Sequence, residues 1–245
     1  MLWLEDATIA FYIALKDARA YYLKPPNISW GMIFPIAMSL ALTLRNPSGI
    51  ADLVPGLIGM ATLFGTTSMA AVTITFEKRI GSLERLLLAP ISLHTLILGK
   101  VLGGSLFGLA ISLVMVFLGA VFLQAPMMNP WLLIPTILIA TLAFSALGCF
   151  VSVVVKEVFE AQTLANLFRF PMIFLSGVFL PIASMPFPAQ LVAYLLRLTY
   201  VVDGLRYAIF GRYEALNPLS GLLVTLFYAI VFFLGSVYAL EKRKS

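Results

Sequence analysis

The sequence predicts an all-α protein that crosses a membrane several times. Of its 245 residues, 61% are hydrophobic and only 11% are charged, and its mean hydropathy is +1.02. A soluble fold of this composition has too little polar surface to cover its apolar groups. The uncharged stretches are much longer than the roughly 10 residues of a porin strand, whereas a helical span needs about 20 apolar residues. We therefore expect one polytopic helical domain over residues 1–245.

Residues 4–24 are predicted to form an amphipathic helix that lies along the membrane surface, with a frayed tail as the alternative. Most of the charged side chains fall off its apolar stripe, and Pro25 and Pro26 end the segment. The stripe recurs at three- and four-residue spacing through Leu4, Ala7, Phe11, Ala14, Ala18 and Tyr22. The charges leave no uninterrupted core of the signal-peptide kind, so we expect this helix to stay on the mature protein.

Six apolar stretches follow, and we expect each to cross the membrane as a helix. They are residues 28–44, 53–76, 93–123, 131–155, 164–183 and 219–240. On the third stretch Gly104, Gly108 and Ser112 stand four residues apart, which predicts a face small enough for close helix contact.

Residues 184–212 do not read as a clean span. Prolines break the segment, and Arg197, Asp203 and Arg206 interrupt its apolar pattern. Irregular backbone at membrane depth is tolerated only where it is buried in protein or lines a cavity. We therefore expect two short re-entrant helices in the outer leaflet between spans five and six.

Lysine and arginine divide unequally between the two faces of this arrangement. Twelve lie in the N-terminal helix, the 77–100 and 156–169 segments and the C-terminal tail, whereas four, Arg45, Arg197, Arg206 and Arg212, lie on the other face. The positive-inside rule then predicts a multi-pass plasma (inner) membrane protein with both termini in the cytoplasm. The same rule explains the net charge of +5, so we expect no nucleic-acid partner.

The sequence contains no recognisable nucleotide-binding, ion-coupling or catalytic site that could drive transport or catalysis. Gly99-Lys100 is the nearest text to a phosphate-binding loop, but His94 stands where the first glycine of that motif belongs. Spans one to four and span six hold no internal acid or base, which disfavours ion coupling. The single Cys149 excludes an intramolecular disulfide and a multi-cysteine metal site. We expect no catalytic residue, metal or directly bound cofactor. An ion-coupled secondary transporter or channel is the main alternative, and a membrane-embedded enzyme or scaffold is a further one.

Residues 77–92 form the densest charge cluster of the chain and are predicted to be a short docking helix on the cytoplasmic face. Leucines on one side would grip the membrane boundary. The exposed ridge on the other side would carry Glu77, Lys78, Arg79, Glu84 and Arg85. A solvated loop that only obeys the positive-inside rule is the alternative.

Two segments resemble ABC-2 type transporter permeases. The segment after the second span of that family is similar to Glu77-Lys-Arg-Ile-Gly-Ser-Leu-Glu-Arg-Leu-Leu-Leu-Ala-Pro90 with Leu98-Gly-Lys100. The family motif around the fifth span and the outer helices is similar to Ser176-Gly-Val-Phe-Leu-Pro181, Met185-Pro186 and Leu198-Thr-Tyr-Val-Val-Asp-Gly-Leu-Arg206. Arg197 departs from the family, whose members often have proline at that position.

The resemblance implies the permease subunit of an ATP-binding cassette exporter. Its partners would be a second permease copy, identical or a paralogue, two copies of a cassette ATPase subunit that hold ATP and Mg, and the lipid bilayer. Residues 77–92 would be the coupling helix, 4–24 an interface helix that also touches the ATPase, and 184–212 the outer gate.

Site residues follow from the same resemblance. The expected ATPase-coupling residues are Glu77, Lys78, Arg79, Gly81, Ser82, Glu84, Arg85 and Pro90. The expected translocation-pathway residues are Thr62, Thr66, Thr67, Thr73, Phe168 and Met172, with ordinary helix packing as their alternative. The expected outer-gate residues are Arg197, Asp203 and Arg206. The last two stand three apart and are predicted to pair. A pathway without fixed charges favours an amphipathic, lipid-like, drug or glycan cargo that moves outward.

Overall fold

The computed structural model describes residues 2–22, 33, 36–38, 40–41 and 51–244. Every regular element in these residues is a helix, which confirms the all-α prediction. Of the expected first span, 28–44, only residues 33, 36–38 and 40–41 are described, so most of this prediction lies outside the described residues. Four described helices are long and apolar enough to cross a membrane: Ala51–Arg79, Leu93–Val121, Pro130–Val154 and Pro218–Lys242. The total of six spans stays a prediction.

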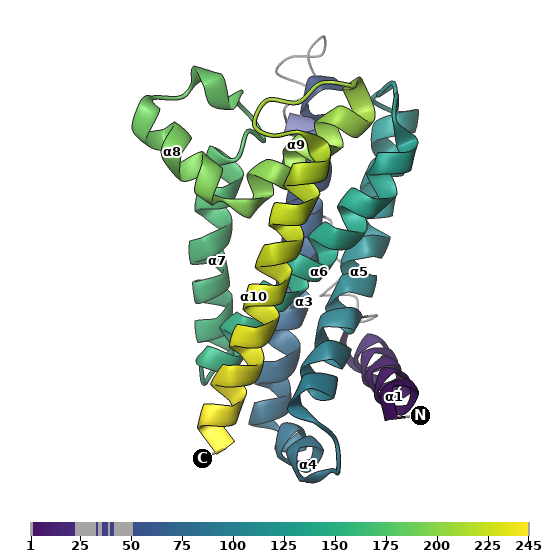
Figure 1. The fold of residues 1–245 in the computed structure, drawn as a ribbon, viewed down its shortest axis with the longest axis vertical. Helices are drawn as coiled ribbons and strands as arrows, with labels where there is room; N and C mark the ends of the chain where they lie inside the picture. Colours follow the sequence, from purple (N-terminus) through teal and green to yellow (C-terminus); the bar gives the residue numbers. More distant parts are fainter. Residues whose placement is uncertain (1, 23–32, 34–35, 39, 42–50, 245) are drawn as a thin grey trace.

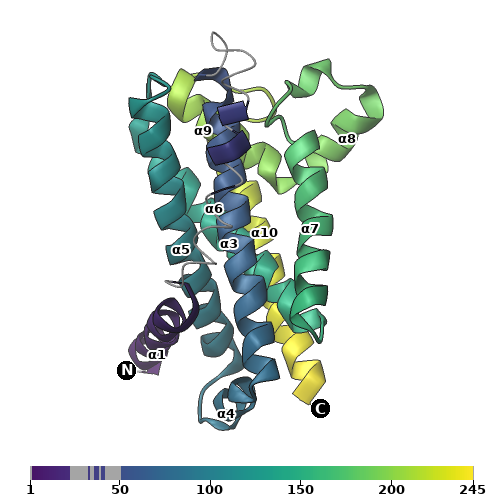
Figure 2. The same cartoon turned by 180° about the vertical axis from the view of Figure 1, so that it is seen from behind.

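The long helices stand side by side along the long axis of the molecule (Figure 1). They are α3 (Val54–Arg79), α5 (Leu93–Val121), α6 (Pro130–Val154), α7 (Val158–Leu175) and α10 (Pro218–Lys244). Viewed from behind, α3 runs between α5 and α7 (Figure 2), and it packs against α5, α6, α7 and α9. Within an apolar 18-residue stretch of each helix, 89% is buried in α3 and 22% in α10. Helix α3 is therefore the central helix and α10 a peripheral one.

The small-residue face predicted on α5 is confirmed by its packing. A Cβ added to Gly104 would stand 2.4 Å from Ser145 Oγ of α6, and one added to Gly108 would stand 2.1 Å from Thr66 Oγ1 of α3. Ser112 lies on the same face and hydrogen-bonds Thr62 of α3 at 2.7 Å. Small side chains therefore let three helix backbones approach closely.

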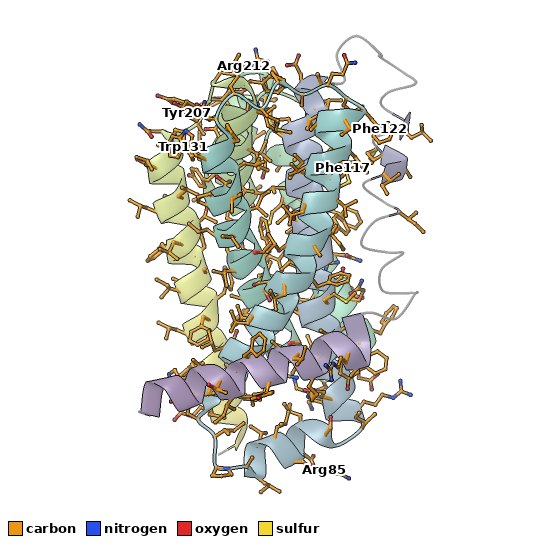
Figure 3. The ribbon with its side chains drawn as sticks, turned by 90° about the vertical axis from the view of Figure 1, so that its right-hand side faces the viewer. Arg85, Phe117, Phe122, Trp131, Tyr207 and Arg212 are labelled. Carbon is orange, nitrogen blue, oxygen red and sulfur yellow. The ribbon has the colours of Figure 1, made fainter. Side chains whose placement is uncertain are left out.

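The N-terminal helix α1 (Leu2–Asp17), continued by the π-helical turn η1 (Ala18–Tyr22), crosses the bundle roughly at right angles to the long helices (Figure 3). It packs on α5, where a Cβ on Gly99 would stand 2.8 Å from Ile13 Cβ. The stripe predicted from sequence is split: Ala14 is buried, whereas Phe11 is 55% exposed.

The opposite end of the bundle carries the irregular elements. After α7 ends at Leu175, a turn with Gly177 at φ +74° leads to the 3-10 turn η3 (Ile182–Ser184), to α8 (Phe187–Leu195) and to α9 (Arg197–Phe210). Helix α8 projects to the side, and α9 returns to pack on α3, α6 and α10 (Figure 1). The stretch expected as one span, 164–183, thus contains residues 164–175 of α7, the turn that follows and the first two residues of η3.

Candidate functional site

A sharp corner at one end of the bundle separates the long helix α3 from the short helix α4 (Ser82–Leu88). Gly81 has φ +69°, a left-handed conformation that glycine adopts without steric cost. After α4, Ala89 is extended and Pro90 follows, and Ser92 then caps α5 by accepting a hydrogen bond from Thr95 N at 3.0 Å. The predicted docking segment therefore consists of the short helix α4 with a turn on each side, and it connects two helices that are long enough to cross a membrane.

Helix α4 keeps one leucine inside and presents charge outside. Leu83 is 5% exposed, whereas Glu84 and Arg85 are exposed and Leu88 is 86% exposed. Arg85 lies at the extreme end of the molecule (Figure 3). This end of the bundle, called here the α4 end, also carries both marked chain termini (Figure 1).

The expectation of a five-residue exposed ridge is wrong for Glu77 and Lys78. Helix α3 continues to Arg79, so its helical period turns Glu77 toward α1 and α5, where the side chain is fully buried. Lys78 Nζ donates to the backbone carbonyls of Ser152 (2.5 Å) and Val155 (3.0 Å) at the last turn of α6. A cation there favourably opposes the negative end of the helix dipole. Of the predicted ridge, only Arg79, Glu84 and Arg85 are exposed.

Glu77 belongs to an ionic cluster of four residues, in which Asp17, Glu77 and Lys100 are buried and Lys16 is exposed. Lys100 Nζ donates to Glu77 Oε2 at 2.5 Å and to Asp17 Oδ2 at 2.8 Å, and Lys16 Nζ donates to Glu77 Oε1. Lys100 is 1% exposed and Asp17 is fully buried. The cluster joins α1, α3 and α5 at one point and balances two positive charges with two negative ones.

Burial and charge act in opposite directions on the members of the cluster that lie on α1. Burial raises the pKa of Asp17, and the nearby Glu77 carboxylate adds to this rise, although Lys100 and Lys16 act to lower it. Burial alone would lower the pKa of Lys16, but its hydrogen bond to Glu77 and the nearby carboxylates raise that pKa. This cluster was not predicted from the sequence. Its signal was an acid and a base, Asp17 and Lys100, each at the edge of an apolar run.

The four predicted pathway threonines lie on different sides of α3. All four are buried, and each hydroxyl donates to the carbonyl four residues earlier in the helix. Thr62 and Thr66 face α5 through Ser112 and Gly108, which favours the packing alternative for them. Thr67 faces α7 instead, because one further residue turns the side chain about 100° around the helix.

Thr67 contacts Arg169, which was predicted to lie elsewhere. Arg169 of α7 is fully buried, its Nε donates to Thr67 Oγ1 at 2.6 Å, and its Nη1 donates to Asn166 Oδ1 at 2.9 Å. The guanidinium also lies 5.2 Å from the ring centroid of Phe64. Arg169 was counted among the cations of the cytoplasmic face, yet it packs against the middle of α3. A lone arginine inside the expected 164–183 span was the available signal. The two pathway residues predicted on the same helix, Phe168 and Met172, are 36% and 4% exposed.

At the other end of the bundle, the predicted pair of Asp203 and Arg206 is only a 4.0 Å contact. Asp203 instead accepts backbone hydrogen bonds from Glu214 (2.6 Å), Ala215 (2.8 Å) and Leu216 (3.0 Å). Arg206 reaches Glu214 Oε1 at 2.8 Å and donates to the carbonyl of Gly177 at 2.9 Å. The two side chains thus tie α9 to the loop after it and to the turn after α7.

Arg197 does not join Asp203 and Arg206. It is 3% exposed and its guanidinium lies 4.3 Å from the ring centroid of Phe232 and 5.6 Å from that of Tyr228, both on α10. The departure from proline at this position therefore introduces a cation–aromatic contact between α9 and α10.

The chain is similar in sequence to known membrane transport proteins. A family model described as ABC-2 type transporter matches residues 10–210. The protein named inner membrane transport permease YadH of Escherichia coli strain K12 is 27% identical over 220 residues, which cover 88% of this chain and 84% of that protein. The permease of the same name from Shigella flexneri gives the same identity and coverage.

Proposed function

The chain belongs to the ABC-2 type transporter family, and from this premise we propose that it is the permease half of an ATP-binding cassette exporter. It is a multi-pass inner membrane protein and a membrane transport subunit. In the proposed assembly two permeases, identical or paralogous, enclose the translocation pathway. Two cassette ATPase subunits, which hold ATP and Mg, dock at the α4 end. That end would face the cytoplasm, and cargo of amphipathic, lipid-like, drug or glycan type would move outward.

The exposed helix α4 is the observation that carries this proposal. Its Glu84, Arg85 and Leu88 combine charge and apolar surface on a protruding turn, which suits a groove on a partner protein. The helix follows α3 after only Ile80 and Gly81, so displacement of α4 acts directly on the central helix of the bundle.

The ionic cluster extends this connection to two further helices. Glu77 lies in the last turn of α3, five residues before Ser82, and its carboxylate is shared between Lys100 of α5 and Lys16 of α1. Movement of α4 would therefore reach α1 and α5 together. Coupling of ATP turnover to transport requires two arrangements of such a connected element.

Copurification with the cassette ATPase encoded nearest to this chain tests the proposal. The test variant is the double reversal Glu84→Lys with Arg85→Glu. The matched control reverses the exposed pair at the opposite end, Asp52→Arg with Arg212→Asp, whose side chains are joined at 2.5 Å. We expect the α4 reversal to weaken assembly or ATP turnover by about tenfold or more, because misplaced charges at an interface cost several kcal/mol and about 1.4 kcal/mol already corresponds to tenfold. The control variant should behave as the wild type.

The proposal requires a complex of two permeases with two ATPases. Failure of any cassette ATPase to copurify, or equal assembly and turnover in wild type and α4 reversal, would contradict it. Transport in vesicles that depends on an ion gradient and not on ATP would then favour the ion-coupled alternative.

A further inference from the structure

Arg169 is a buried cation whose hydrogen bonds are incomplete. Nε and Nη1 are used by Thr67 and Asn166, but the buried Nη2 has no hydrogen-bond partner among the described residues. A buried guanidinium without a counter-charge is unfavourable, because burial removes hydration that only an anion or several acceptors can replace. The seam between α3 and α7 therefore holds an unsatisfied positive charge.

No carboxylate of the chain lies at the depth of Arg169. The sequence has no Asp or Glu at 18–51, 53–76, 85–156, 161–202 or 215–240, which includes the residues outside the described ranges. Along α3, Thr67 is ten residues from Glu77 and fifteen from Asp52, or roughly 15 and 22 Å at about 1.5 Å per residue. Along α7, Glu160 is nine residues away, or about 14 Å by the same rise.

The acids beyond α7 are also distant from Arg169. Asp203 and Glu214 contact Arg206, which donates to the carbonyl of Gly177. Gly177 is eight residues past Arg169, or about 12 Å along a helix. A second copy of the chain, inserted in the same orientation, brings its acids to the same two ends of the bundle. The missing anion therefore comes neither from this chain nor from an identical second copy of it.

A polar stripe connects Arg169 with a cavity at the α4 end. Gln162, Asn166 and Arg169 stand at intervals of four and three residues, so they share one side of α7. Gln162 borders a cavity of about 750 Å³ between α3 and α7, and its buried Oε1 has no partner among the described residues. The cavity wall carries three cations and one acid, Lys78, Arg79, Lys156 and Glu157. An anion is thus attracted to the mouth of the seam in which Arg169 lies.

The apolar surroundings of the guanidinium indicate the rest of the ligand. Phe64 of α3 lies beside Arg169 of α7, and the buried Met172 and Ile173 follow Arg169 along α7. A small hydrated anion would lose its water against such side chains, whereas a molecule with an acyl or other apolar portion would bury that portion there. The seam therefore combines one point of positive charge with an apolar lining.

We propose that Arg169 binds the anionic headgroup of an amphipathic cargo, of phosphate or carboxylate type, that enters from the cavity between α3 and α7. This inference rests on the proposed transport function and specifies its cargo class. Access requires α7 to separate from α3. Helix α7 stands at the side of the bundle (Figure 1), where it packs on α3 and also contacts α6, so its separation would break these contacts and leave those of α3 with α5 and α6 in place.

Lipid binding to the purified full-length chain, without any ATPase, tests the inference. The probes are fluorescent phosphatidylglycerol and fluorescent phosphatidylcholine with the same acyl chains, and fluorescence anisotropy in micelles reports binding. We expect the wild type to bind the anionic lipid about fivefold or more tightly than the zwitterionic one, since charge-assisted hydrogen bonds distinguish the headgroups. Arg169→Gln should abolish that preference, and Arg169→Lys should keep most of it.

Arg212→Gln is the matched control, because it removes one positive charge from an exposed position at the far end of the bundle. It should keep the preference of the wild type. Soluble glycerol 3-phosphate, added at the same concentration as the lipid, should not displace it. Each variant is first shown to be monodisperse.

Three outcomes would overturn the inference: equal binding of both lipids by the wild type, an unchanged preference in Arg169→Gln, or displacement by glycerol 3-phosphate. Because the assay contains no ATPase, its failure leaves the coupling proposal intact. Failure of ATPase copurification likewise leaves the lipid result intact.

Discussion

The central helix α3 has two seams that differ in composition and in the completeness of their hydrogen bonds. On the side of α5 and α6, glycines at 104, 108 and 148 bring the backbones together. The hydroxyls there are paired, as in the 2.7 Å hydrogen bond between Thr62 and Ser112 and the 2.8 Å bond from Ser145 to a carbonyl of α5. On the side of α7, two buried polar atoms, of Gln162 and Arg169, have no partner among the described residues, and a cavity opens between the helices.

This difference indicates that the seam with α5 and α6 is rigid, whereas the seam with α7 is suited to ligand binding. Close packing with paired hydroxyls has little alternative arrangement, so α3, α5 and α6 form a rigid unit. A seam with unsatisfied polar groups is stabilised by a ligand that supplies the missing hydrogen bonds, and functional sites commonly trade stability in this way. The ionic cluster connects the rigid unit to α1. A displacement of α4 would therefore be transmitted through the cluster to α1.

The largest expected effect is overpacking of the rigid seam. Gly108→Leu places a Cβ 2.1 Å from Thr66 Oγ1 and 3.0 Å from Thr66 Cβ, so α5 must move away from α3. We expect a loss of more than about 3 kcal/mol of stability and little folded protein, because overpacked cores relax poorly. Gly221→Leu in α10 is the control, since its Cβ would meet Tyr200 at an ordinary 3.6 Å. Thermal unfolding in detergent measures both, and equal stability of the two variants would contradict the distinction.

Removal of the shared cation of the ionic cluster should have the next largest effect. Lys100→Met leaves Asp17 and Glu77 without their buried partner, and the one cation that still contacts both among the described residues is Lys16, which is exposed. The expected cost is about 3–5 kcal/mol, the usual consequence of breaking a buried ion pair from one side. Lys156→Met, which removes an exposed lysine, should change stability by less than about 0.5 kcal/mol. A Lys100→Met protein with the melting temperature of the wild type would mean that Lys100 contributes no stability through the cluster.

A smaller loss is expected at the α9 end, where a carboxylate organises a loop. Asp203→Asn keeps the shape of the side chain but removes its charge and one acceptor oxygen from three backbone N–H groups. Hydrogen bonds to a charged group contribute about 1.5–3 kcal/mol, so we expect a cost near 2 kcal/mol. Faster proteolysis between residues 211 and 217 would localise the effect to this loop. Uniform destabilisation, with unchanged cleavage there, would place the role of Asp203 elsewhere.

The smallest expected change is at Arg169, and its sign is opposite. Arg169→Met removes two hydrogen bonds together with an uncompensated buried charge, so we expect thermal stability to be unchanged or raised by up to about 1 kcal/mol. Thr67→Val, which removes only the hydroxyl acceptor, should instead lower stability slightly, since it leaves Nε of Arg169 unpaired as well. A clear loss of stability in Arg169→Met would make the two seams equivalent structural contacts.

The sequence by itself determined the helical membrane class, the short exposed helix that carries Glu84 and Arg85, and the small-residue face of α5, because composition and helical periodicity act locally. The first span, the total of six spans and the cytoplasmic position of the termini stay predictions. Only the tertiary structure decided the partners of the charged residues. Glu77 was expected in a solvent-exposed ridge and Arg169 at the cytoplasmic face, yet each is buried against residues distant in the chain, at separations of 61 and 102 positions. Periodicity states which side of a helix a residue occupies, whereas burial of a charge depends on the helix that packs against that side.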